Sequence, residues 1–111
     1  MEISKADWKL FRSKLPAWQE AYMNRLNQEY IAILSGDSNP SYKFWALEER
    51  IIEDRKSPGV RCELDKGKML YTILGLLGDK VITVEDLNEF SDSLKKVVQS
   101  HLAFMKEEYV W

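Results

Sequence analysis

The amino-acid sequence predicts an all-α fold, a compact bundle of five to six helices that forms a single domain over residues 1–111. Apolar side chains recur every three or four residues along most of the chain, which is the spacing of amphipathic helices. Glycine and proline stand between these segments, next to residue types that cap helix ends. The segment 66–77 is apolar around nearly its whole circumference, so we expect it to be the helix at the centre of the bundle.

The first two predicted helices meet at Pro16. Ser4 has the short polar side chain that caps a helix start, and the first helix is expected to run to about Lys14. Proline lacks a backbone N–H and disfavours helical geometry in the residue before it, so we predict a break at Leu15. Pro16 then suits the first turn of a second helix, which is expected to end near Leu34.

A third helix is predicted from Pro40, with Asn39 as its cap, to about Lys56. Its inner, core-facing side is expected to consist of apolar positions at helical spacing: Phe44, Leu47 (or Glu48), Ile51 and Ile52. Proline and glycine within residues 57–59 should end this helix.

The second half of the chain has two features beyond the central helix. Residues 60–64 alternate between apolar and charged side chains, which leaves open a minor two-stranded ribbon with residues 81–83. Thr83 begins a capping pattern for a short helix to about Glu89, and Ser91 suits the cap of the last helix. The inner face of that last helix is predicted to hold Leu94, Val98, His101 and Met105.

Composition and charge exclude several classes of protein. The chain has a net charge of −2, with eight basic and nine acidic residues in 1–55 and the same numbers in 56–111, so neither half attracts nucleic acid or an anionic membrane. The single cysteine, Cys62, cannot form an internal disulfide, which favours a cytoplasmic setting. The longest apolar run, residues 69–77, is much shorter than the roughly 20 residues that cross a bilayer.

Residues that carry chemistry are sparse and scattered. His101 and Cys62 each occur once and stand in no ligand or nucleophile pattern, so the sequence predicts no enzyme, no cofactor and no metal site. Residues 37–48 place oxygen-bearing side chains as a calcium-binding loop does, but Tyr42 occupies the position where such a loop needs glycine. A capped helix start explains that stretch better.

The candidate partner-binding residues lie near the N-terminus. Lys5, Lys9 and Arg12 form a basic stripe at helical spacing beside Trp8, which suits phosphates or an acidic protein surface, with the indole as an anchor. The alternative, which the pattern favours, is a solvated face next to a core tryptophan. Four tryptophans exceed the need of one small core, and residues 109–111 either pack back or pair with another copy.

Three pairs of segments together resemble a known group of sequences. They are WKLFR at 8–12 with WQEAY at 18–22, KFWALEER at 43–50 leading to SPGV at 57–60, and VITVEDL at 81–87 leading to FSDSL at 90–94. They resemble a family of short, uncharacterised bacterial proteins of gut bacteria and their mobile elements, some labelled "multidrug transporter". The resemblance implies a cytoplasmic accessory protein of a mobile element and brings no site residues. The transporter label disagrees with the length of the apolar runs.

These observations predict a non-enzymatic protein-binding module that occludes or bridges another protein. One version is an inhibitor of a defence nuclease, of the anti-CRISPR kind. The alternative is a nucleic-acid-binding regulator that uses the basic stripe of the first helix. A homodimer stays open, and no membrane partner is expected.

Overall fold

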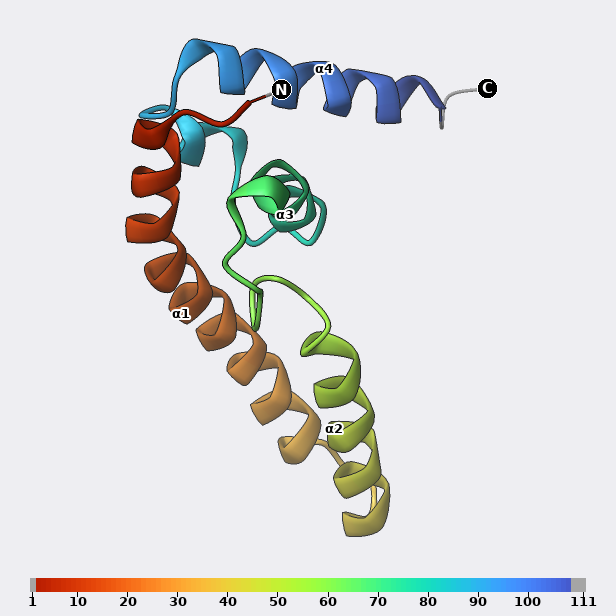
Figure 1. Cartoon of the computed structure of the whole chain (residues 1–111). Helices are drawn as coiled ribbons and strands as arrows, with labels where there is room; N and C mark the ends of the chain where they lie inside the picture. The colour runs from red at the N-terminus through yellow and green to blue at the C-terminus, as the bar shows by residue number, and fades with distance from the viewer. Residues whose placement is uncertain (1, 109–111) are drawn as a thin grey trace.

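The computed structural model describes residues 2–108, which form four α-helices and two short 3-10 helices (Figure 1). The α-helices are α1 (Lys5–Ser35), α2 (Pro40–Asp54), α3 (Met69–Gly78) and α4 (Asp92–Glu108), and the 3-10 helices are η1 (Lys66–Lys68) and η2 (Val84–Leu87). The all-α prediction is therefore confirmed. The last helix, α4, begins at Asp92, directly after its predicted cap Ser91. The number of α-helices is smaller than the predicted five to six.

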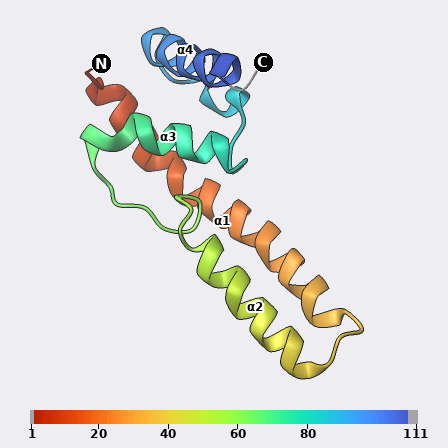
Figure 2. The same cartoon turned by 90° about the vertical axis from the view of Figure 1, so that its right-hand side faces the viewer.

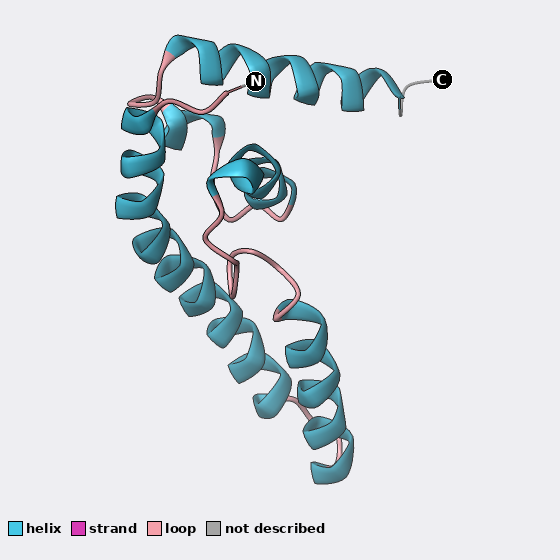
Figure 3. Cartoon of the chain, in the orientation of Figure 1, coloured by secondary structure: helices cyan, strands magenta, loops and turns pink. Residues whose placement is uncertain are grey.

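No strand occurs in residues 2–108, so the predicted ribbon between 60–64 and 81–83 is wrong (Figure 3). The backbone groups that a ribbon would need are used in turns. The N–H groups of Val60 and Arg61 donate to the carbonyl of Ser57, at 3.0 and 3.1 Å. The N–H of Val81 donates to the carbonyl of Leu76 at 2.8 Å, which closes the turn after α3.

The helix α1 is continuous through Pro16, where the sequence predicts a break. Proline removes one backbone hydrogen bond, but Pro16 and Arg12, whose carbonyl loses its donor, are both at exposed positions. Phe11 and Leu15 pack into the core on the other side, so the turn that leads into Pro16 is held in helical form against the head. Figure 1 shows α1 changing direction within its N-terminal part, as expected for a helix that contains proline.

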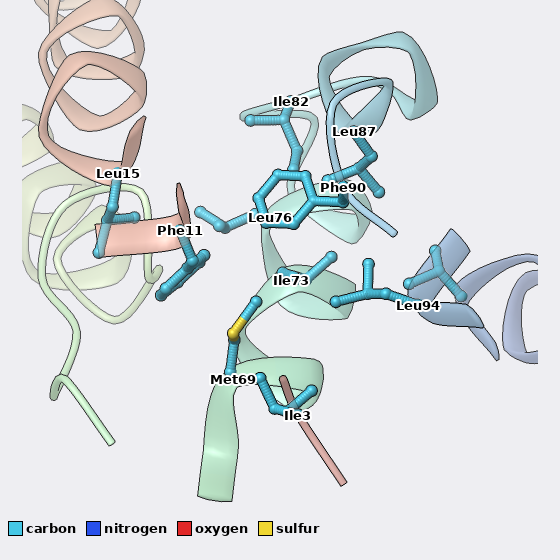
Figure 4. Packing of buried hydrophobic residues seen from close by; sticks show 11 residues of the cluster. Ile3, Phe11, Leu15, Met69, Ile73, Leu76, Ile82, Leu87, Phe90 and Leu94 are labelled. Carbon is cyan, nitrogen blue, oxygen red and sulfur yellow. The ribbon is translucent and has the colours of Figure 1, made fainter. Parts of the chain in front are cut away.

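The hydrophobic core gathers around α3 (Figure 4). Met69, Ile73 and Leu76 on one side of α3 are inaccessible to water, which confirms its central place, whereas Tyr71 on another side is exposed. Around them pack buried residues from the N-terminal segment, the first half of α1, η2 with the loops on either side of it, and α4: Ile3, Phe11, Leu15, Ile82, Leu87, Phe90, Leu94 and Val98. We call this part of the molecule the head.

The starts of α1 and α4 are joined inside the head by Asp7, which is buried. Its carboxylate accepts hydrogen bonds from the backbone N–H of Ser91 at 3.0 Å and from the Ser91 hydroxyl at 2.6 Å. The Ser91 hydroxyl in turn accepts from the N–H of Leu94, so the predicted cap of the last helix is confirmed. His101 and Met105, predicted for the inner face of α4, are exposed because the core ends near Val98.

The second half of α1 and the whole of α2 form an antiparallel pair that extends away from the head (Figure 2). We call residues 23–54 the hairpin. The molecule measures 52 × 39 × 21 Å with a radius of gyration of 16.8 Å, against about 13 Å for a compact chain of this length. The prediction of a compact bundle is therefore wrong. Across residues 2–108, no helix combines the length and apolarity needed to span a bilayer.

Candidate functional site

The predicted basic stripe lies on the first turns of α1. Lys5, Lys9 and Arg12 are exposed there, whereas Trp8 is half-buried and packs against the core. The Trp8 ring stacks on Phe11, with 6.1 Å between ring centroids. The Arg12 guanidinium lies 5.3 Å from the centre of the Trp8 ring, a cation–π distance. The Trp8 ring therefore contacts the core and the Arg12 guanidinium, and it does not project into solvent as the predicted binding anchor would.

Among the tryptophans of residues 2–108, the exposed one lies elsewhere, on α2. Trp45 is 60% exposed and its neighbour Phe44 is 62% exposed, and their rings meet edge to face with 5.0 Å between centroids. Trp18, by contrast, packs against Phe11 and Phe90 in the head. The predictions for Trp111 and the rest of residues 109–111 lie outside the described residues.

Most of the predicted inner side of α2 faces solvent, with Leu47 half-buried, which corrects the sequence interpretation. No residue of α2 is buried, and Ile51 and Ile52 are exposed together with Phe44. The physical reason is the topology, because the head covers only the first half of α1 and no other segment of residues 2–108 packs on the outer surface of the hairpin. A shallow groove runs along this side of α2, lined by Phe44, Leu47, Glu48, Ile51, Ile52 and Arg55.

The same surface continues onto α1. Met23 and Asn27 of α1 line a depression together with Ile51, Arg55 and Val60. Two further apolar residues of α1, Ile31 and Leu34, follow Asn27 by four and seven residues and so lie on the same side of the helix. They are 54% and 48% exposed. We call the combined apolar surface the hairpin face and define it by Met23, Ile31, Leu34, Phe44, Leu47, Ile51 and Ile52, with Glu48 and Arg55 as its charged residues.

Polar contacts hold the two helices of the hairpin together. The Tyr30 hydroxyl donates to Asp54 at 2.6 Å, and the Arg50 guanidinium lies 3.1 Å from Glu29 and 3.4 Å from Asp54. Burial, followed by the hydrogen bond to Asp54, raises the pKa of Tyr30 to about 12. Since these contacts and the buried Leu26 join α1 to α2, the residues of the hairpin face remain available to another molecule.

The residues with intrinsic reactivity are placed apart from this surface. Cys62 lies between α2 and η1, and burial raises the pKa of its thiol, which lowers the fraction of reactive thiolate at neutral pH. His101 lies on α4 with its Nδ1 atom 2.9 Å from the carbonyl of Val97. Among residues 2–108, no three His, Cys, Asp or Glu side chains come together as a metal site.

Comparison of the chain with models of protein families, with curated proteins and with solved structures finds no match.

Proposed function

We propose that this chain is a non-enzymatic protein-binding module and that the hairpin face is its contact surface. One observation carries the proposal, namely that large apolar side chains gather on a helix that buries none of its residues within the chain. Soluble proteins rarely leave such a contiguous surface to water unless another molecule covers it. Phenylalanine is also among the aromatic residues that are enriched at protein interfaces, which fits the exposed Phe44 of the hairpin face.

The form of the surface specifies the kind of partner. Two antiparallel helices present a ridged apolar strip, which suits the apolar side of another helix or helical pair. Glu48 and Arg55 line the same groove as the apolar residues, so a partner with complementary charges would be held in one register. Binding of this kind occludes or bridges the partner and leaves its covalent structure unchanged.

A second candidate function, nucleic-acid binding, is favoured by the exposure of Lys5, Lys9 and Arg12 on one end of α1. It predicts binding that falls steeply as salt concentration rises, because each phosphate contact releases counterions. The same stripe also suits an acidic protein surface.

Site-specific photo-cross-linking tests the proposed function. A photoreactive benzoylphenylalanine replaces Phe44 in the purified chain, which is irradiated in native-host lysate with and without nuclease. The matched control carries the same residue in place of Gln28, an exposed residue of α1 that lies outside the hairpin face. Mass spectrometry then identifies each adduct, and circular dichroism checks that both variants are folded.

We expect a defined protein adduct from position 44, unchanged by nuclease and missing from position 28. A second copy of the chain counts as a protein adduct. If position 44 yields no adduct beyond those of position 28, the hairpin face is not a contact surface and the proposal fails. Nucleic-acid capture that Lys9→Glu abolishes would then support the second candidate.

A further inference from the structure

We infer that the molecule which covers the hairpin face is a second copy of this chain, docked so that the two α2 helices run antiparallel about a two-fold axis. This inference rests on the proposed function and names its partner. It depends on three properties of the hairpin: the positions of its two charged residues, a depression that matches its exposed aromatic, and its lack of a core.

The charged residues are self-complementary. In a two-fold interface every contact occurs twice. If residue i of the first copy contacts residue j of the second, then residue j of the first copy contacts residue i of the second. When the axis passes between Ile51 and Ile52, each Ile51 faces the second copy's Ile52. The same register places Glu48 opposite Arg55, and Arg55 opposite Glu48, because both pairs of residue numbers have the same midpoint. One surface therefore supplies two opposite-charge pairs, each about 5 Å along the helix from the axis.

The apolar residues fit the same register. Phe44 lies about 11 Å from the axis along α2 and would face the second copy beyond the end of its α2 helix. That is where Met23 and Val60 line the depression between the two helices. A side chain that is 62% exposed in one copy thus meets a shallow apolar hollow in the other.

The hairpin resembles half of a four-helix bundle. Residues 23–54 bury only Leu26, so two helices are present without the layer that normally forms between helix pairs. Stacking two hairpins face to face would create that layer from Ile31, Leu47 and Ile51 of both copies. Stable dimers bury about 800 Å² from each partner, which requires both helices of the hairpin and not α2 alone. The continuation of the hairpin face onto α1 brings this second helix into the contact.

Reversal of charge tests the inference without relying on loss of folding. Sedimentation equilibrium is measured from micromolar to millimolar chain, at low salt and at about 150 mM ionic strength, for the wild type, Glu48→Arg, Arg55→Glu and the double variant. Glu49→Arg is the matched control, because Glu49 is also exposed on α2 but does not line this groove. Circular dichroism confirms that each variant is helical.

We expect a wild-type dimer that dissociates about tenfold more readily in either single variant, since each places two like-charge pairs across the axis. The double variant should regain most of the lost affinity, and Glu49→Arg should associate as the wild type does. A wild-type monomer throughout the concentration range overturns the inference, as does a dimer that the single variants leave unchanged or the double variant does not restore. A monomeric wild type that still cross-links to a different protein from position 44 would refute the self-association alone and leave the proposed function standing.

Discussion

The head and the hairpin of this molecule are built from the same kind of amphipathic helix, yet the head buries most of its apolar residues and the hairpin buries one. In the head, Ile73, Leu76 and Leu94 are inaccessible to water. In the hairpin, Ile51 and Ile52 are exposed, and Leu26 alone is buried among residues 23–54. The difference shows that an apolar helix face specifies burial but not the molecule that provides it. The head is covered by its own chain, whereas the hairpin presents its face outward.

The largest expected effect compares two isoleucines, one from each region. Ile73→Ala should lower the free energy of unfolding by about 3 kcal/mol, because it opens a cavity at a fully buried position. Ile51→Ala should change it by about 0.5 kcal/mol or less, because that side chain is 42% exposed. Urea unfolding at low chain concentration, where self-association does not contribute, measures both. Equal losses of stability would mean that the hairpin has a core of its own, so that the head and the hairpin would not differ in how they bury apolar side chains.

Local features of the sequence predicted where helices begin. The Ser4 hydroxyl accepts the N–H of Asp7 at 3.1 Å and the Asn39 side chain accepts that of Tyr42 at 3.0 Å, so the predicted starts of α1 and α2 are confirmed. A cap is predictable because its hydrogen bond spans three residues and needs no other part of the chain. The central place of α3 was predictable for a similar reason, since Met69, Ile73 and Leu76 lie close together in sequence.

Features that depend on distant residues were not predictable in the same way. A proline in a helix interior costs about 3 kcal/mol, which predicts a break at Pro16. Burial of Phe11 and Leu15 in the core of the head contributes about 1.5–3 kcal/mol for each side chain and keeps α1 continuous. The outward direction of Phe44 follows from where the head ends, which periodicity does not encode. One signal was present, because adjacent Phe44 and Trp45 cannot both face inward from one helix. The basic stripe at Lys5, Lys9 and Arg12 stays a prediction.

An intermediate effect is expected where the hairpin joins the head, at Gly59. A Cβ atom at this position would lie 2.5 Å from the Tyr22 ring of α1 and 2.5 Å from a methyl group of Val81 after α3, so side chains of two separate segments close around the glycine. Gly59→Ala should cost about 2 kcal/mol through overpacking. Thermal unfolding followed by circular dichroism measures the loss.

Gly78→Ala is the matched control for this junction. Apart from its chain neighbours and the backbone of its own helix, no atom lies within 4 Å of a Cβ at Gly78, and alanine is favoured over glycine in a helix by up to about 1 kcal/mol. We expect this variant to be as stable as the wild type or slightly more stable. If Gly59→Ala behaved like Gly78→Ala, the junction would be loosely packed, and the head and the hairpin would move as separate bodies.

The smallest effect concerns the polar contacts that hold the hairpin together, and it is seen at high pH. Burial and the hydrogen bond to Asp54 raise the pKa of Tyr30 from 10.0 to about 12. Between these two values the unfolded chain loses this proton while the folded chain keeps it, so the unfolded state binds fewer protons and stability falls as pH rises. The contribution of Tyr30 is fully present below pH 10 and is lost as the pH passes about 12.

Tyr30→Phe removes both the proton and the hydrogen bond, so it isolates this contribution. The difference in tyrosinate absorbance between the wild type and the variant should titrate near pH 12, and the decline in stability above pH 10 should be shallower in the variant. A difference that titrates near 10 would show that the contact with Asp54 does not persist in solution. The hairpin would then lack the hydrogen bond between Tyr30 and Asp54 as well as a core. Another molecule would have to cover the hairpin face to keep α2 packed against α1.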